Sequence, residues 1–252
     1  MLPLILAAFL ATTAHACPAT DFAGGVPPAA PGVVVICEDG YSLGHSAERR
    51  EPLWSAEYLS AAGVAEALAA KRFGTFHPEP LLPKADRSEL QDYLCAGDKD
   101  RGHMVAVGDK GKPEQENATF SLANMVPQND ELNEGLWAGI EGAVRTLAQQ
   151  DDELYVVTGP LFDPAHTLLL NGRVAIPTQV WKAVYVPKTK RAAVYVAEND
   201  ASGTWHTETV AELASQIGFD PMPGLPDAVK YAKGDLPAPT KLDSVLKLRT
   251  CK

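Results

Sequence analysis

Apolar residues recur at three- and four-residue steps between residues 131 and 150, the most regular pattern in the chain. Side chains at such steps lie on one face of a helix. Asn129 or Asp130, immediately before this segment, is suited to cap the first turn. The pattern therefore predicts an amphipathic helix over 131–150. The apolar positions are Leu132, Leu136, Ile140, Val144 and Leu147.

Shorter apolar runs bounded by Gly and Pro predict β-strands, and the last two, separated by residues 187–191, predict a hairpin. An Ala-rich stretch ending at Lys71 and residues 207–217 predict short helices, whereas residues 73–99 are expected to be loop. Strands and helices do not alternate regularly, which favours an α+β fold with a mixed, mainly antiparallel central sheet flanked by helices. The expected strands are 33–36, 53–59, 154–158 (ended by Gly159-Pro160), 174–186 and 192–197.

The N-terminus has the pattern of an export signal. Residues 2–10 are a short apolar run, and Ala14-His15-Ala16 is a small-residue cleavage site. The run is too short to span a membrane, and no other stretch is long enough. We therefore expect a signal peptide over 1–16, an N-terminal arm over 17–50, a single domain over 51–252, and a secreted or periplasmic protein without a membrane anchor.

Four cysteines in an exported chain indicate two disulfides. Three pairings are compatible with four cysteines, and free buried thiols are the alternative. We favour Cys17–Cys37, which would pin the N-terminal arm, together with Cys95–Cys251, which would tie the C-terminus to the segment before residue 100. No C-x-x-C spacing is present, so a zinc knuckle is not expected.

The chain is acidic, with 22 Lys and Arg against 32 Asp and Glu and a net charge of −10. This argues against a protein that coats nucleic acid through bulk electrostatic attraction. It leaves room for an enzyme that contacts a few phosphates through a local basic cleft and a bound cation.

Four polar or aromatic residues follow one another at four-residue steps along the predicted helix: Asn133, Trp137, Glu141 and Arg145. Each step turns the side chain by only about 40° relative to the last, and Asn133 and Glu141 are roughly 12 Å apart along the axis. The stripe can therefore present an amide, an indole, a carboxylate and a guanidinium to one cleft. The alternative is a solvated polar face with its tryptophan against the core.

Two motifs precede this stripe: Asp100-Arg101-Gly102-His103, and SLANMVPQ over residues 121–128. The order DRGH, SLANMVPQ, N-x3-W-x3-E resembles the DNA/RNA non-specific endonuclease family. That family includes secreted bacterial nucleases and mitochondrial endonuclease G, and it has the ββα-metal fold. Further matches lie at Trp54 with Tyr58, at Arg72, and in residues 156–162 and 176–182. The likeness extends from about residue 53 to about residue 200, and it implies that 51–252 is the endonuclease domain.

The resemblance implies a base and a metal. His103 would be the general base that activates water, and an imidazole with an ordinary pKa near ~6.5 suits that task. Asn133 would be the sole direct protein ligand of Mg²⁺, with Mn²⁺ as a substitute, and Glu141 would hold metal-bound waters. Magnesium prefers oxygen ligands and keeps several waters, so one amide oxygen is a plausible anchor.

The resemblance also implies phosphate contacts. Arg72 and Arg145 would bind the phosphate, since a guanidinium donates two hydrogen bonds to it at once. Arg101 would be structural or close to the phosphate, and Asn124 would help orient the active-site groups.

No recognition helix or zinc finger is apparent, and contacts confined to phosphate and sugar carry no sequence information. The expected substrates are therefore DNA and RNA alike, and an inhibitor or immunity protein is a possible partner. Two alternatives stay open: a non-catalytic module that binds nucleic acid or protein, and a phosphodiesterase for another substrate. Four other histidines do not have the spacing of metal ligands, and we expect no role for them in the site: His45, His77, His166 and His206.

Overall fold

A computed structural model describes residues 17–243 of the chain. The expected signal peptide therefore lies outside the described residues, and so does Cys251 with its predicted bridge to Cys95. In the part that is described, no helix is both long and apolar enough to cross a membrane.

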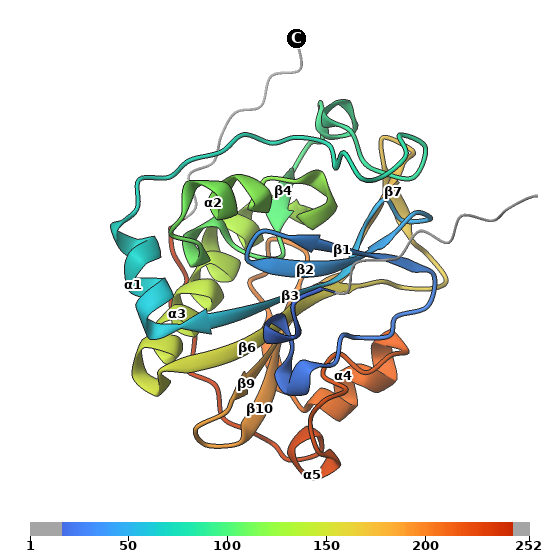
Figure 1. Cartoon of the computed structure of the whole chain (residues 1–252). Coiled ribbons are helices and arrows are strands. Elements are labelled where there is room, and N and C mark those ends of the chain that lie inside the picture. Colours follow the sequence, from blue (N-terminus) through green and yellow to red (C-terminus); the bar gives the residue numbers. More distant parts are fainter. Residues whose placement is uncertain (1–16, 244–252) are drawn as a thin grey trace, which may run out of the picture.

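A seven-stranded, fully antiparallel sheet runs through the centre of the molecule (Figure 1). Two small hairpins, β4–β5 and β7–β8, lie beside it. The α+β class with a mainly antiparallel sheet is thereby confirmed. In spatial order the central strands are β1 (Val33–Glu38), β2 (Tyr41–Ser46), β3 (Glu51–Ser60), β6 (Glu153–Leu161), β9 (Gln179–Val186), β10 (Arg191–Glu198) and β11 (Trp205–Glu208). The hairpins are β4 (Lys99–His103) with β5 (Met125–Asn129), and β7 (Leu168–Leu170) with β8 (Val174–Ile176).

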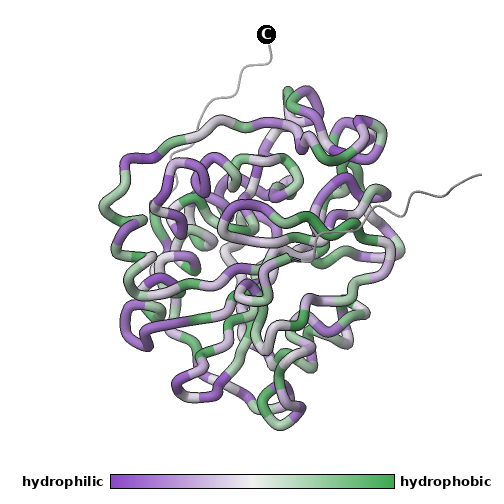
Figure 2. Tube along the Cα trace, viewed as in Figure 1, coloured by the Kyte–Doolittle hydropathy of each residue, from purple (hydrophilic) through white to green (hydrophobic). Residues whose placement is uncertain are grey.

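The sheet is covered by layers on both faces, because alternate residues of its central strands point to opposite sides. In β10, Tyr195 belongs to the core on the face covered by α3, whereas Val194 belongs to the core beneath the N-terminal turns and α4. The strand interiors are apolar and the β9–β10 turn is hydrophilic (Figure 2). The helices are α1 (Ala61–Ala69), α2 (Pro113–Thr119), α3 (Ala138–Asp151), α4 (Val210–Ile217) and α5 (Asp227–Lys230). Short 3-10 turns are η1 (Ala19–Asp21), η2 (Ala23–Gly25), η3 (Leu90–Tyr93), η4 (Val107–Asp109) and η5 (Leu122–Asn124).

The helix predicted over 131–150 is present, but its first part is a π-helix, η6 (Leu132–Trp137), which leads directly into α3. The Asn129 side chain accepts a hydrogen bond from the Leu132 N–H at 3.2 Å, which is the capping role expected for it. The apolar spacing predicted the helix, but it did not predict that the first turns would be π-helical.

Two strand predictions were wrong at a proline. β6 does not end at Gly159-Pro160 but continues to Leu161. Beyond Thr158 it pairs only with β9, so the missing N–H of Pro160 leaves no second neighbour unsatisfied. The run expected over 174–186 is instead divided into β8 and β9 around Pro177, which lacks the N–H needed to continue a ladder.

The helix predicted over 207–217 begins later, at Val210, because Thr209 and Glu212 form a capping box there. Residues 205–208 instead form the edge strand β11. The short helix expected before Lys71 is α1, whose first turn is capped by Ser60.

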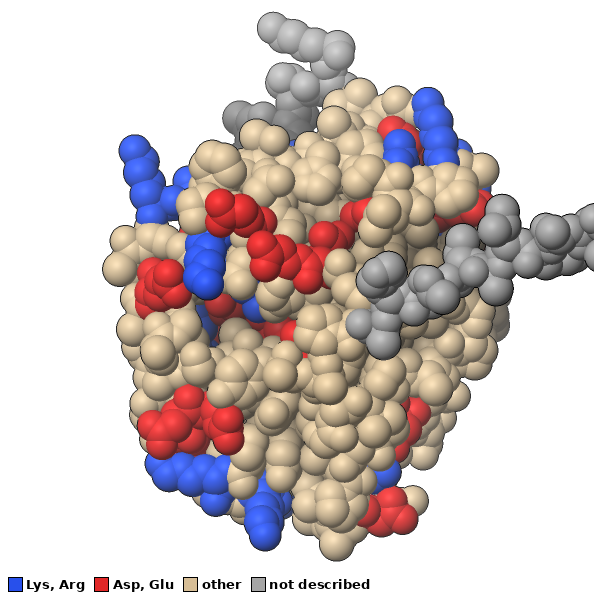
Figure 3. Space-filling model, viewed as in Figure 1, with Lys and Arg blue, Asp and Glu red and all other residues tan. Residues whose placement is uncertain are grey.

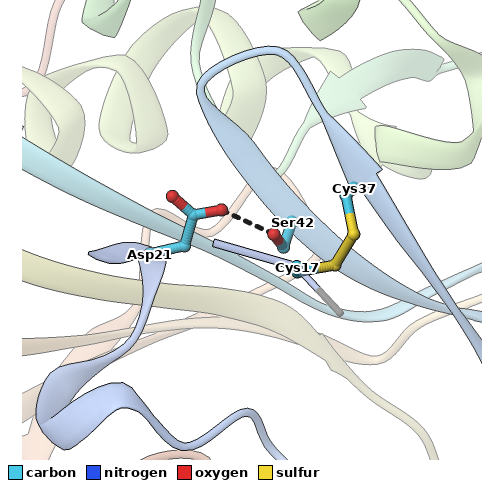
Figure 4. The surroundings of a disulfide bond; sticks show 4 residues. All are labelled: Cys17, Asp21, Cys37 and Ser42. Atoms are coloured by element: carbon cyan, nitrogen blue, oxygen red, sulfur yellow. Dashed lines mark hydrogen bonds between the residues drawn. A yellow bond between two sulfur atoms is a disulfide. The ribbon is translucent and has the colours of Figure 1, made fainter. Parts of the chain in front are cut away.

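The N-terminal segment contributes two strands rather than the single one expected at 33–36. β1 and β2 extend the central sheet beyond β3, so residues 17–50 are continuous with the domain. The predicted disulfide between Cys17 and Cys37 is present and ties the start of the segment to β1 (Figure 4). Beside it, the buried Asp21 accepts a hydrogen bond of 2.5 Å from Ser42.

Charged side chains are unevenly distributed over the face seen in Figure 3. Acidic residues form a row across its upper middle, and basic residues are scattered, some at the edges and some beside and within the hollow below that row. This face therefore offers no continuous basic surface to nucleic acid, in agreement with the acidic net charge.

Candidate active site

The β4–β5 hairpin and the helix that follows it bring two predicted site residues together. His103 ends β4 opposite Met125, and β5 ends at Asn129, where the helical segment carrying Asn133 begins. A strand pair followed at once by a helix thus places His103 and Asn133 on the wall of one cavity.

Gly102 is required by the close approach of the two strands of this hairpin. A Cβ atom built on Gly102 would lie 2.1 Å from Oε1 and 2.5 Å from Cβ of Gln128. Both distances are shorter than non-bonded contacts allow. The glycine of the DRGH motif therefore lets β4 pair with β5 in the register that places His103 at the cavity.

The cavity has a volume of about 500 Å³ and collects six of the seven residues predicted for the site. Three of the six are arginines, and the lining also holds three carboxylates, so the formal charges balance in this cavity of an acidic protein. These six are Arg72, Arg101, His103, Asn133, Glu141 and Arg145, and the other lining residues are Phe76, Asp100, Ala106, Val107, Gly108, Glu134 and Ala138.

His103 is held between aromatic rings rather than by hydrogen bonds. Its ring centroid lies 5.7 Å from that of Phe76 and 5.3 Å from that of Phe120. Its Nε2 is buried, and neither ring nitrogen is hydrogen-bonded within residues 17–243. Burial, followed by repulsion from Arg72 and Arg101, lowers the pKa of His103 to about 3. The imidazole is therefore neutral at pH 7 and can accept a proton.

The two arginines that repel a His103 cation are stacked on the same rings. The Arg101 guanidinium lies 4.1 Å from the Phe76 ring centroid, and that of Arg72 lies 5.5 Å from the Phe120 centroid. A guanidinium over an aromatic face is attracted by the ring and keeps its hydrogen-bond donors free at its edge. The N–H donors of both guanidinium groups are therefore available beside the imidazole.

Asn133 is oriented by Asp100, the first residue of the DRGH motif. Its Nδ2 donates a hydrogen bond of 2.9 Å to Oδ2 of Asp100. An ionised carboxylate can only accept, so this contact fixes which end of the amide is the NH₂ group. The amide oxygen of Asn133 is the atom left to bind a cation.

Glu141 is a second oxygen donor on the cavity wall. It forms no ion pair or hydrogen bond within the described part of the chain, and burial raises its pKa to about 7, with a further contribution from Asp109. The next residue of the stripe, Arg145, is held by Asp109 at 2.8 Å. An unpaired, partly desolvated carboxylate is a group that a bound cation would stabilise in its charged form.

The donor set fits a hydrated magnesium ion better than a transition metal. No group of three or more His, Cys, Asp or Glu suited to bind a metal occurs among residues 17–243. An amide oxygen and a carboxylate on the wall of the same cavity are hard ligands, and Mg²⁺ is commonly held by one or two such groups while it keeps several waters. Asn133 and Glu141 are the residues that would hold it.

Trp137 does not line the cavity, whereas the other three residues of the stripe do. It is fully buried, with the ammonium of Lys182 5.4 Å from its ring centroid. The π-helical turn between Asn133 and Trp137 changes the angular step that a regular α-helix would have. Of the two interpretations of the stripe, the one with the tryptophan against the core holds for Trp137, and the one with a shared cleft holds for the other three residues.

Lys182 lies beneath the site and was not predicted. It is 1% exposed, forms no ion pair within residues 17–243, and donates to Thr158 Oγ1 at 2.7 Å and to the Met104 carbonyl at 3.3 Å. It thus connects the residue after His103 with the tryptophan of the helix. Its only sequence signal was its place in the motif of residues 176–182.

Asn124 does not line the cavity but holds the chain just after His103. Its side chain accepts from Val105 N at 3.0 Å and donates to Val105 O at 2.9 Å, and it also accepts from Ser55 Oγ at 3.1 Å. These bonds link β3 to the segment that follows β4. They are compatible with the orienting role expected for Asn124, which stays a prediction.

Three other contributors escaped the sequence reasoning or were given no role in it. Asp100 was visible in the DRGH motif itself. Asp109, six residues after His103, could face the cleft on the sequence alone, but a loop carboxylate was the favoured interpretation. Phe76 gave no signal, because it lies in the long segment expected to be loop.

A β-hairpin joined to a helix, with a histidine and an asparagine facing one cavity, defines a ββα-metal site. The comparisons give the family: the model for DNA/RNA non-specific endonucleases matches residues 24–228, and the chain belongs to that family.

Similar proteins include mitochondrial and fungal nucleases. The chain is 34% identical to the mitochondrial nuclease EXOG of Danio rerio over 58% of this chain and 45% of that protein. It is 33% identical to Nuclease C1 of Cunninghamella echinulata var. echinulata over 63% of this chain and 68% of that protein. It thus spans less than half the length of EXOG. A crystal structure of EndoG with EndoGI, described as showing the mechanism of EndoG inhibition, matches with a TM-score of 0.68 and 26% identity over 78% of this chain and 87% of that one.

Proposed function

We propose that the protein is a metal-dependent endonuclease that hydrolyses phosphodiester bonds of DNA and RNA without sequence preference. The observation that carries this proposal is the cavity that brings His103, with neither ring nitrogen hydrogen-bonded within residues 17–243, together with Asn133 and three arginines. The family membership supports the same class of reaction.

In this proposal His103 takes a proton from the attacking water. Its low pKa keeps it neutral before substrate arrives, but it also makes the imidazole a weak base. A phosphate bound beside Arg72 and Arg101 neutralises the charges that repel a His103 cation. The part of the pKa depression that the two arginines cause is then removed, whereas the larger part, which burial causes, remains. The pKa of His103 therefore rises in part, and the base gains some strength when substrate is in place.

Arg72, Arg101 and Arg145 orient the phosphate, since each can donate two hydrogen bonds to its oxygens. Asn133, with Glu141 on the wall of the same cavity, would hold Mg²⁺ (or Mn²⁺ as a substitute). When bound, this ion supplies charge neutralisation at the phosphate and the leaving oxygen. Because these groups act on the backbone of the nucleic acid, cleavage is expected to be independent of sequence and of the type of sugar.

The test is a plasmid-nicking and RNA-degradation assay with purified protein. We expect cleavage with Mg²⁺, none with EDTA, and a loss of at least about 10²-fold in His103→Ala and Asn133→Ala. His166→Ala is the matched control, because His166 is a surface histidine whose side chain is 82% exposed. Full cleavage by His103→Ala would remove the base assignment, and nucleic-acid binding without turnover in any divalent ion would favour a non-catalytic module.

We also propose export of the protein, as the expected signal peptide and the Cys17–Cys37 disulfide support. N-terminal sequencing of protein recovered from the medium or periplasm should begin at Cys17. Protein that retains residues 1–16 inside the cell would contradict export.

An inhibitor protein is a further part of the proposal, supported by the description of the similar EndoG–EndoGI complex. Such a protein should abolish nicking in proportion to its amount, and Arg72→Ala should weaken its binding if it covers the cavity. Binding without any effect on cleavage would contradict inhibition at this site.

A further inference from the structure

A C-terminal strap, residues 236–242, crosses the helix that carries Asn133, Glu141 and Arg145. It is anchored at both ends. Near its start, Tyr195 Oη donates to the Pro237 carbonyl at 2.6 Å. Near its end, the Leu242 N–H donates to the Gly135 carbonyl at 3.3 Å, inside the π-helical turn.

The helix surface beneath the strap is bare because two of its residues are glycine. A Cβ on Gly139 would lie 2.2 Å from the Thr240 carbonyl oxygen, and one on Gly135 would lie 3.3 Å from that of Leu242. Glycine in a helix costs about 1 kcal/mol relative to alanine, so its presence needs a compensating contact. Here that contact is backbone packed directly on backbone.

Gly142, one turn further along the same helix, has no such contact. A Cβ built on it meets nothing within 4 Å. The tight packing is therefore specific to the two glycines under the strap, and Gly142 offers a matched control position.

The strap and the active-site cavity lie against the same part of the helix. A groove of about 460 Å³ between strap and helix is lined by Ala138 and Arg145, which also line the active-site cavity. π-Helical turns are rare and are frequently found at functional sites. The π-helical turn η6 contains Asn133, and the strap donates a hydrogen bond from Leu242 to Gly135 of the same turn.

We propose that the strap is a positioning element, and that Gly135 and Gly139 are the positioning residues that let it hold the π-helical turn and thereby Asn133. The proposal rests on the proposed function for its catalytic consequence. Its structural consequence, an ordered turn in the metal-free protein, does not depend on activity.

The test compares Gly139→Ala with Gly142→Ala. In Gly139→Ala the strap or the helix must shift by about 1 Å to relieve the contact, and displacements of this size at a site cost up to about 10²-fold in rate. We expect kcat to fall at least about tenfold and the half-saturating Mg²⁺ concentration to rise, with the KM for DNA unchanged. Backbone amides of residues 132–137 should exchange hydrogen faster in EDTA. Gly142→Ala should match the wild type in all four.

A second variant, Tyr195→Phe, releases the other anchor of the strap without adding an atom. It should also accelerate exchange over 132–137 and lower kcat about threefold, and its effect should be less than additive with that of Gly139→Ala. If Gly139→Ala does not fold, Tyr195→Phe decides the question.

Exchange and kcat in either folded variant within twofold of Gly142→Ala would overturn the proposal. An inactive wild type would instead refute the proposed function, and the exchange measurement would still test the strap.

Discussion

The neutral, desolvated state of His103 has a measurable consequence for stability. Its pKa is about 3 in the folded protein and would return to 6.5 on unfolding. Below pH 6.5 the unfolded chain binds a proton that the folded protein does not. The depressed pKa therefore costs no stability above pH 6.5 and progressively more as the pH falls towards 3.

The expected size follows from the two pKa values. Between pH 7.5 and pH 5, the preferential protonation of the unfolded state lowers the free energy of unfolding by about 2 kcal/mol. His103→Gln has no such proton to bind, so its stability should fall by about 2 kcal/mol less than that of the wild type over the same interval.

The assay is urea unfolding at both pH values, in EDTA and at low ionic strength, so that the repulsion from Arg72 and Arg101 is not screened. His166→Gln, an exposed histidine, serves as the control and should follow the wild type. A difference below about 0.7 kcal/mol between wild type and His103→Gln would refute the reasoning, because His103 would then titrate near its ordinary pKa.

Three further predictions concern residues around the same cavity. Gly102→Ala should lower the free energy of unfolding by about 1–3 kcal/mol in urea, because the added Cβ would collide with Gln128. An unchanged urea midpoint would contradict the close approach of β4 and β5 at this position. At a low, subsaturating Mg²⁺ concentration, the kcat/KM of the wild type should fall as the pH drops through about 7, because the pKa of Glu141 without a cation is raised to about 7 and its ionised form is the one that would support the cation. Saturating Mg²⁺ should move this fall to lower pH, because the cation stabilises the ionised form. Glu141→Gln should be slower, and a fall at the same pH in its profile would assign the titration to another group. Lys182→Met should lower kcat about tenfold, because the Met104 carbonyl loses its donor. Its Tm should not fall, because a buried ammonium without an ion-pair partner is costly. A fall in Tm together with the fall in kcat would make the role of Lys182 structural.

Local patterns were sufficient for much of the fold. The apolar spacing over 131–150 predicted the long helix, and Asn129 caps it as expected. The predicted strand boundaries were wrong at two prolines, because the effect of a proline on a strand depends on how many strands pair with it. Pro160 is tolerated where β6 has one pairing partner, whereas Pro177 separates two strands. The number of neighbouring strands is a property of the sheet and is not encoded near the proline.

The site was predicted where its members belong to contiguous motifs. The DRGH tetrapeptide and the four-residue steps of Asn133, Glu141 and Arg145 indicated which residues would meet, and the cavity contains them. The same steps left the position of Trp137 open between cleft and core, because periodicity in a sequence cannot distinguish a π-helical turn from an α-helical one.

The sequence by itself therefore determined the family resemblance, the candidate base and metal ligand, and the main helix, since each depends on residues close together in the chain. Only the tertiary structure decided that Lys182 would lie under the site and that a strap would pack on Gly139. Those contacts join segments about 80 and 100 residues apart, and they depend on how the sheet and helix pack rather than on any local pattern.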